Sequence, residues 1–205
     1  MAAANVPNRT VTLVVLGDCH SGRTCLRMSY EYGEYPTRYI PTILENSSLD
    51  KTVDGETVHL MLFEVPLPEE FDLLRPFRYP DADICLILVR VDCLECLNHA
   101  ETVWLRTIQV NCPRAKYILV GSQIDRRADN DAVAKFEDEH HRPMISPSEG
   151  EAFARRINAW GYMECSALTR EGVDELFDEA IRTVIHDRDR MRPSLFKRIS
   201  DIFKI

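Results

Sequence analysis

The sequence predicts a doubly wound α/β fold, with a mostly parallel sheet and helices on both of its faces. Three short apolar runs rich in β-branched residues lie at residues 11–16, 84–91 and 117–120, and such runs suit strands that are buried on both sides. Stretches long enough for crossover helices separate them. Because ligands of this fold bind at the carboxyl ends of the strands, functional residues are expected in the loops that follow these runs.

The other elements follow in the order that this fold requires. Residues 49–53 and 58–63 flank Asp54-Gly55, a pattern typical of a hairpin, which adds one antiparallel strand to the sheet. Helices are expected at residues 22–32, 99–110, 148–160 and 173–186. In the last of these an apolar stripe recurs at helical spacing: Val173, Leu176, Phe177, Ala180, Ile181 and Val184. Residues 128–147 form a polar insertion whose acidic run is typical of a solvated helix face.

Charge is distributed unevenly along the 205 residues, whose formal net charge is −8. Residues 187–205 carry six basic and three acidic side chains, so residues 1–186 hold a net charge of −11. The length suits one domain, and a chain that is 45% hydrophobic is not largely disordered. We divide it into an extension (1–10), a domain (11–186) and a basic tail. The acidic domain excludes general nucleic-acid binding, which depends on Lys and Arg.

The seven cysteines are an odd number, scattered along the chain, and no signal-peptide pattern precedes them. This favours a reducing compartment, the cytoplasm, and free thiols. Cys93 and Cys96 form a lone CxxC motif, and a metal or redox role is the minor alternative because no second pair accompanies it. No apolar run approaches the ~18–20 residues that cross a bilayer. A soluble protein, or one attached to a membrane surface, is expected.

The loop after the first predicted strand carries a phosphate-binding pattern. Residues 17–24 (GDCHSGRT) match G-x-x-x-x-G-[KR]-[ST], with Arg23 where such loops have Lys. In this pattern the glycines let backbone amides wrap a phosphate at a helix N-terminus, the cation reaches the outer phosphates and the Thr hydroxyl ligates Mg²⁺. The position between a strand and a helix favours this chemistry over a chance match.

Over residues 11–185 the chain resembles the Rho branch of the Ras-superfamily small GTPases. Residues 39–42 (YIPT) resemble switch I, residues 74–80 (LRPFRYP) the segment after switch II, and residues 164–169 (ECSALT) the guanine-specificity loop. The insertion at 128–147 lies where Rho proteins carry their insert helix. The resemblance implies the P-loop small-GTPase fold: a mostly parallel six-stranded sheet with one antiparallel edge strand, helices on both faces and a Rho-type insert helix.

The resemblance also implies GTP or GDP and Mg²⁺ as cofactors. Thr24 and Thr42 would ligate Mg²⁺, Tyr35 would pack against guanine, Asp125 would accept both guanine N–H groups and the Ala167 amide would face the guanine oxygen. For Tyr35, ordinary packing in a surface loop is the alternative. The expected nucleotide-binding residues are Gly17, Cys19, His20, Ser21, Gly22, Arg23, Thr24, Cys25, Tyr35, Thr42, Gln123, Asp125, Ser166, Ala167 and Leu168.

The family's switch II motif, D-x-x-G-Q, is replaced by residues 64–68 (EVPLP). Glu64 is one methylene longer than the Asp that holds Mg²⁺ through water, and Mg²⁺ demands near-octahedral geometry. Leu67 replaces a Gly whose amide approaches the γ-phosphate. Pro68 replaces the Gln that orients the attacking water. We therefore assign no catalytic residue, and hydrolysis is expected to be absent or very slow.

Three further departures lie at the nucleotide itself. Cys19 stands where most of the family has a Gly, and a larger residue crowds the in-line transition state, although a tolerated small side chain is the plain alternative. Arg23 keeps the positive charge of the usual Lys but not its compact shape. Gln123 replaces a Lys whose stem lies along the base, so the affinity for nucleotide is expected to fall.

The tail departs from the family, whose members mostly end in a prenylated cysteine box. Here no Cys follows Cys165, so prenylation is not expected. The tail instead has the pattern of a short basic amphipathic helix, with Leu195, Phe196, Ile199, Ile202 and Phe203 as its apolar residues and Lys197, Arg198 and Lys204 elsewhere. An anionic membrane surface is the favoured target. A partner groove and the acidic body of the protein itself remain the alternatives.

Two classes of function stay open. The first is a Rho-like switch locked on, similar in logic to the Rnd group, which binds GTP and Mg²⁺, does not hydrolyse GTP and engages effector proteins as a monomer in cytoskeletal or morphology signalling. Its effector contacts would lie in switch I, at Tyr39, Ile40, Thr42 and Glu45. The second is a pseudo-GTPase, an interaction scaffold with weak nucleotide binding or none. A working GTPase is a further, less favoured alternative.

Overall fold

The computed structural model describes residues 9–36, 47–64 and 81–191, with side chains up to residue 188. The expected effector residues Tyr39, Ile40, Thr42 and Glu45 lie outside these ranges, as do Leu67, Pro68 and residues 192–205 of the tail. What the sequence predicts for them stays a prediction.

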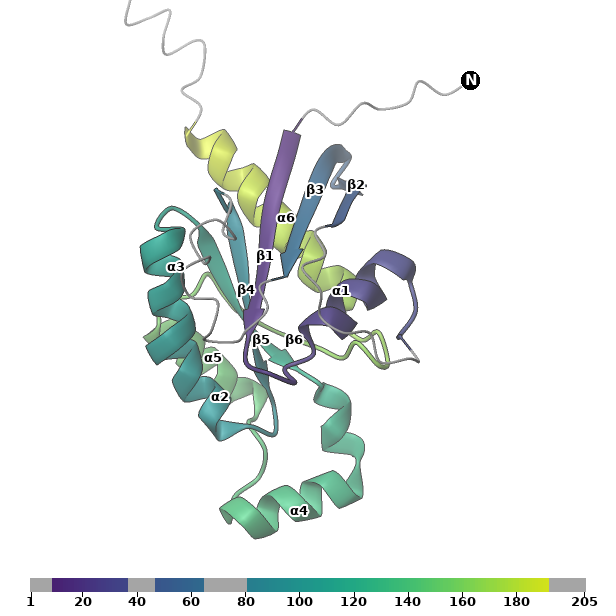
Figure 1. Cartoon of the computed structure of the whole chain (residues 1–205), viewed down its shortest axis with the longest axis vertical. Helices are drawn as coiled ribbons and strands as arrows, with labels where there is room; N and C mark the ends of the chain where they lie inside the picture. Colours follow the sequence, from purple (N-terminus) through teal and green to yellow (C-terminus); the bar gives the residue numbers. More distant parts are fainter. Residues whose placement is uncertain (1–8, 37–46, 65–80, 192–205) are drawn as a thin grey trace, which may run out of the picture.

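One six-stranded sheet forms the centre of the molecule (Figure 1), in the order β2-β3-β1-β4-β5-β6. The strands are β1 (Arg9–Gly17), β2 (Ser47–Val53), β3 (Glu56–Glu64), β4 (Ile84–Arg90), β5 (Lys116–Ser122) and β6 (Tyr162–Cys165). Only β2, at the edge, pairs antiparallel among the strands described. The predicted fold class is confirmed, including the hairpin turn at Asp54-Gly55, where both residues have positive φ.

Helices cover both faces of this sheet. They are α1 (Arg23–Tyr32), α2 (Leu94–His99), the π-helical turn η2 (Ala100–Trp104), α3 (Leu105–Asn111), the 3-10 turn η3 (Ile124–Ala128), α4 (Asn130–His140), α5 (Pro147–Arg156) and α6 (Val173–Met191). Figure 1 shows α2 running on into α3 beside α5, while α4 stands apart from the sheet. None of the described helices is long and apolar enough to span a membrane.

Alternate residues of the central strands β1, β4 and β5 pack into two apolar cores on opposite faces of the sheet. Leu13 and Val15 of β1 pack with α1 and α6, whereas Val14 and Leu16 pack with α2, η2, α3 and α5. All four side chains are fully buried, as expected for a strand covered on both sides. Both cores lie behind the carboxyl ends of the strands, so they fix the loops that emerge there.

Several element bounds differ from the prediction. The helix expected from residue 99 begins at Leu94. The last helix continues to Met191, and Arg188 within it bonds Asp83 and the Thr10 carbonyl. The strand β6 was not predicted, because in this short strand only Cys165 is buried. The polar insertion does contain a helix, α4, whose one buried residue is Phe136.

The expectation that all cysteines are free is wrong for one pair. Cys93 and Cys96 form a disulfide, because the CxxC spacing at the first turn of a helix brings their Cα atoms to 5.4 Å. The other five cysteines carry free thiols.

Candidate functional site

The glycine loop (residues 17–22) connects the end of β1 to the start of α1. A Cβ on Gly17 would lie 2.7 Å from the Leu88 carbonyl oxygen and 2.7 Å from Ser21 Oγ, so only glycine fits there. Gly22, the N-cap of α1, has φ 89°, a left-handed conformation that glycine adopts without strain. The loop therefore depends on both glycines of the sequence pattern.

The first turn of α1 differs from the starts of the two other long helices nearby. Asp129 and Ser146 cap α4 and α5 with their side chains. In the part of the chain that the structure describes, no side chain caps α1, and its first turn has no acidic residue. A helix start of this kind attracts an anion through its amides and its dipole. The geometry fits a phosphate group here.

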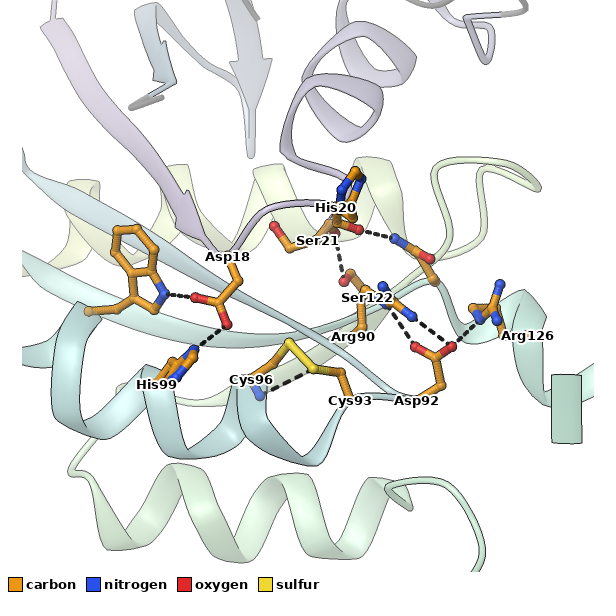
Figure 2. The surroundings of a disulfide bond; sticks show 12 residues. Asp18, His20, Ser21, Arg90, Asp92, Cys93, Cys96, His99, Ser122 and Arg126 are labelled. Atoms are coloured by element: carbon orange, nitrogen blue, oxygen red, sulfur yellow. Dashed lines mark hydrogen bonds and ion pairs between the residues drawn. A yellow bond between two sulfur atoms is a disulfide. The ribbon is translucent and has the colours of Figure 1, made fainter. Parts of the chain in front are cut away.

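Residues at the end of β5 brace the glycine loop. Ser122 Oγ donates a hydrogen bond to the Ser21 carbonyl at 2.9 Å, and Gln123 Nε2 donates one to the His20 carbonyl at 2.8 Å. Figure 2 shows the first of these bonds bridging the loop and the strand. Gln123 thus lies against the loop, and it has the left-handed φ of 59°. His20 itself, at φ 64°, is exposed, like its neighbour Cys19.

The next turn carries the expected guanine-binding carboxylate. Ser166 Oγ donates a hydrogen bond to Asp125 Oδ1 at 2.5 Å and accepts one from the Thr169 amide at 3.1 Å. A carboxylate has about four lone-pair sites, so this contact orients Asp125 and leaves acceptor capacity for a base. Ala167 is tied to α1, because Ser29 Oγ donates to its carbonyl at 3.0 Å. Leu168, beside it, is exposed.

Tyr35 lies near the start of α1, beside Cys25; its expected contact with guanine stays a prediction. Cys25 Sγ lies 3.8 Å from the Tyr35 hydroxyl oxygen. This contact raises the pKa of Tyr35, and burial adds to the shift. Tyr35 is 37% exposed as a whole residue, so part of its surface is open to a ligand. Arg23, in contrast, is buried.

An ion network lies beside Thr24, the expected Mg²⁺ ligand among the described residues. The register of β1 with β3 pairs Val15 with Glu64, so the Glu64 carboxylate reaches the base of the glycine loop. There it accepts a hydrogen bond from Thr24 Oγ1, and Arg27 Nε lies 3.4 Å from its other oxygen. Arg27 also donates to Glu31 at 2.7 Å.

This network changes the chemistry of the metal position. Glu64 and Arg27 are both almost fully buried, at 3% and 2% exposure. A hydroxyl that donates its proton keeps lone pairs, so Thr24 can still ligate a cation. Arg27, however, lies between the Glu64 and Glu31 carboxylates and offsets part of the negative charge that would attract one. The described residues contain no cluster of three or more His, Cys, Asp or Glu side chains suited to a metal. The residues fit a phosphate and a base well, and a tightly held Mg²⁺ poorly.

Sequence reasoning missed three supporting contacts. Arg27 pairs with Glu64 across two elements, and only its helical spacing from Thr24 and Glu31 hinted at a shared face. Asp18 of the glycine loop accepts hydrogen bonds from His99 Nδ1 and Trp104 Nε1, both at 2.8 Å. These two residues lie on another helix, so no local signal marks them.

The site is thus formed by three loops at the carboxyl edge of one sheet: the glycine loop, the turn after β5 and the loop after β6. A family model described as "Ras family" matches residues 12–186 of the chain. The match includes every described residue of the site.

Proposed function

The chain belongs to the Ras family of small GTP-binding proteins, and from this premise we propose that it is an atypical, Rho-like member that binds guanine nucleotide and hydrolyses GTP very slowly or not at all. One observation carries the proposal. Glu64, in the place of the metal-holding Asp, bonds Thr24 and Arg27 within the protein.

Nucleotide binding is supported by what the three loops retain. The uncapped start of α1 offers its amides to a phosphate, and Asp125 is oriented by Ser166 to accept guanine N–H groups. Gln123 keeps the link to the glycine loop through the His20 carbonyl. The groups that bind nucleotide are therefore largely those of the family, although Arg23 and Gln123 differ.

Magnesium binding is proposed to be weak. When bound, Mg²⁺ would neutralise charge on the outer phosphates. Thr24 is the candidate Mg²⁺ ligand among the described residues. Thr42, the second expected Mg²⁺ ligand, lies outside them. Arg27 lowers the net negative charge beside Thr24, and a guanidinium near a metal position opposes a second cation. We expect nucleotide to stay bound when a chelator removes Mg²⁺.

Slow hydrolysis is supported by the sequence as well as by the network. Pro68 has no side chain that orients a water, Leu67 replaces a Gly, and Cys19 adds bulk beside the γ-phosphate position. Each change opposes the in-line attack of water on the terminal phosphate.

The finer Rho-like features of the proposal rest on the resemblance. Switch I, with Tyr39, Ile40, Thr42 and Glu45, would bind effector proteins in cytoskeletal signalling. The basic tail would bring the protein to an anionic membrane surface from the cytoplasm. Cosedimentation with phosphatidylserine vesicles tests the tail, and equal binding by a chain that ends at residue 187 would exclude it as the anchor.

A pseudo-GTPase scaffold is the second candidate. The same buried contact between Arg27 and Glu64 favours it, because a protein that fills its own metal position does not need the cofactor to fold.

One experiment separates these functions. The full chain is purified without added nucleotide and denatured, and the released compounds are chromatographed. Stoichiometric GTP supports the locked switch, and GDP indicates hydrolysis. If no nucleotide is released, the purified chain is refilled with GTP in the presence and absence of EDTA. Failure to bind under both conditions overturns nucleotide binding and leaves the scaffold. Asp131→Asn is the control variant, because it changes an exposed carboxylate on α4 outside the three loops. It should bind GTP as the natural chain does.

A further inference from the structure

The disulfide between Cys93 and Cys96 lies where the chain passes from β4 into α2 (Figure 2). Cys93 Sγ also accepts a hydrogen bond from the Cys96 amide at 3.3 Å, so this residue caps the helix with its sulfur. Cys93 is partly exposed, whereas Cys96 is buried. An attacking thiolate therefore reaches Cys93 first.

On one side of this disulfide, the chain is tied to the turn that carries Asp125. Asp92, the residue before Cys93, accepts two hydrogen bonds from Arg90, at 2.8 and 2.9 Å, and one from Arg126. Burial raises the pKa of Asp92, but the two guanidinium groups outweigh it and hold that pKa below its ordinary value. The anion is thus firmly held, and Arg126 is the residue next to Asp125.

On the other side, the helix is tied to the glycine loop. His99, at the end of α2, bonds Asp18 at 2.8 Å, and Trp104 bonds the other oxygen of the same carboxylate. Figure 2 shows the contact between His99 and Asp18. The helical turn that the disulfide closes therefore lies between contacts that reach two of the three nucleotide loops.

We propose that Cys93 and Cys96 form a site of reversible thiol–disulfide exchange with a dithiol, and that opening the disulfide loosens this helical turn and its contacts to Asp18 and Arg126. The disulfide encloses two residues within one turn, so it does not join distant parts of the fold. The five other cysteines stay free, so it belongs to no wider disulfide framework. Its effect is local to the nucleotide loops.

The exchange balances as a two-electron transfer. A thiolate of the dithiol attacks Cys93 Sγ, the disulfide breaks, and its electron pair leaves on Cys96 Sγ, which takes up a proton. The second thiol of the dithiol then attacks the mixed disulfide and releases Cys93 as a thiol. The dithiol is oxidised to a disulfide, the protein gains two thiols, and oxidation is the reverse reaction.

A single tryptic peptide reports the redox state. Cleavage after Arg90 and Arg106 yields residues 91–106, which contain both cysteines of the pair and none of the other five. The folded full chain is equilibrated in mixtures of reduced and oxidised dithiothreitol, alkylated and digested. We expect this peptide to pass from disulfide to dithiol as the mixture becomes more reducing. A peptide that stays dithiol in oxidised dithiothreitol, or stays disulfide in excess reduced dithiothreitol, overturns the proposal.

Hydrogen exchange tests the loosening without any nucleotide. Reduction should speed amide exchange in residues 94–99 by about tenfold, the order expected from opening so short a loop. Exchange in the glycine loop should rise with it. Equal exchange in the two forms overturns the proposal. In the double variant Cys93→Ser with Cys96→Ser, amide exchange should be as fast as in the reduced chain. Dithiothreitol should not change it.

The functional consequence rests on the proposed nucleotide binding and has its own readout. Release of a fluorescent GDP should be about fivefold faster from the reduced chain, the lower end of typical coupling between two sites. If nucleotide binds but release is equal in both forms, the coupling is overturned. If neither the oxidised nor the reduced chain binds nucleotide but their amide hydrogen exchange still differs, the redox site is supported and the proposed function is overturned.

Discussion

The guanine side and the metal side of the site are built from similar elements but have different chemistry. On the guanine side, the partly exposed Asp125 accepts a hydrogen bond from the buried Ser166 and keeps acceptor capacity for a ligand. On the metal side, Glu64 is buried and already bonded to Thr24 and Arg27. This difference is the basis of our proposal that the protein binds a base and phosphates more firmly than it binds Mg²⁺. Nucleotide binding and hydrolysis are then separable properties.

The largest expected effect is on stability, on the metal side. Replacing Arg27 by Met keeps the apolar stem but leaves Glu64 buried without its cation, which should cost about 3–5 kcal/mol of unfolding free energy. Urea unfolding followed by circular dichroism measures it. The control, Arg155→Met, removes an exposed pair with Glu151 and should cost less than about 1 kcal/mol. Equal losses in the two variants would show that the buried network does not stabilise this side.

The next effect is on affinity, on the guanine side. Asp125→Asn removes the charged acceptor of two base N–H groups, and hydrogen bonds to charged groups contribute about 1.5–3 kcal/mol each, so affinity for fluorescent GDP should fall by about 100-fold or more. Unfolding free energy should change little, because the amide oxygen of Asn can still accept the hydrogen bond from Ser166 Oγ. An unchanged dissociation constant would contradict the assignment of Asp125.

A smaller effect is expected where β5 braces the glycine loop. Gln123→Ala removes the hydrogen bond to the His20 carbonyl, a neutral bond that contributes about 0.5–1.5 kcal/mol, so GDP affinity should fall by about 3- to 10-fold. Gln109→Ala, on the exposed face of α3, is the matched control. A loss of the same size in both variants would mean that the brace has no specific role.

The smallest effect concerns pH and lies beside the guanine side. Burial raises the pKa of Glu164, but hydrogen bonds from Arg127 and Tyr162 outweigh it and bring the pKa below its ordinary value of 4.5. A carboxyl with a lowered pKa stabilises the fold fully above that ordinary value, and this contribution is lost as the pH falls through the folded-state pKa.

The difference in unfolding free energy between the natural chain and Glu164→Gln should therefore be largest at neutral pH and shrink below about pH 4.5. Chemical unfolding at a series of pH values measures it. A difference that stays constant down to strongly acidic pH would show that Glu164 does not titrate in this way.

Most of the fold follows from local patterns in the sequence. The apolar runs predict β1, β4 and β5, because a strand buried on both faces needs no polar residue within it. The glycine loop can also be predicted, because its pattern spans only residues 17–24. The pattern does not predict β6, because only one of its four residues is buried, nor the start of α2 at Leu94, where a sulfur rather than Ser, Thr, Asp or Asn caps the helix.

The sequence by itself determined the α/β order, the glycine loop and the identity of Asp125 and Glu64, because each depends on residues that are neighbours in the chain. The tertiary structure decided what Glu64 does. Arg27 and Glu64 are 37 residues apart, and they meet because the parallel register sets the end of β3 beside the end of β1. The tertiary structure also brings His99 and Trp104 to Asp18, which is more than 80 positions away in the sequence. Contacts of this kind depend on packing geometry, which no local pattern encodes.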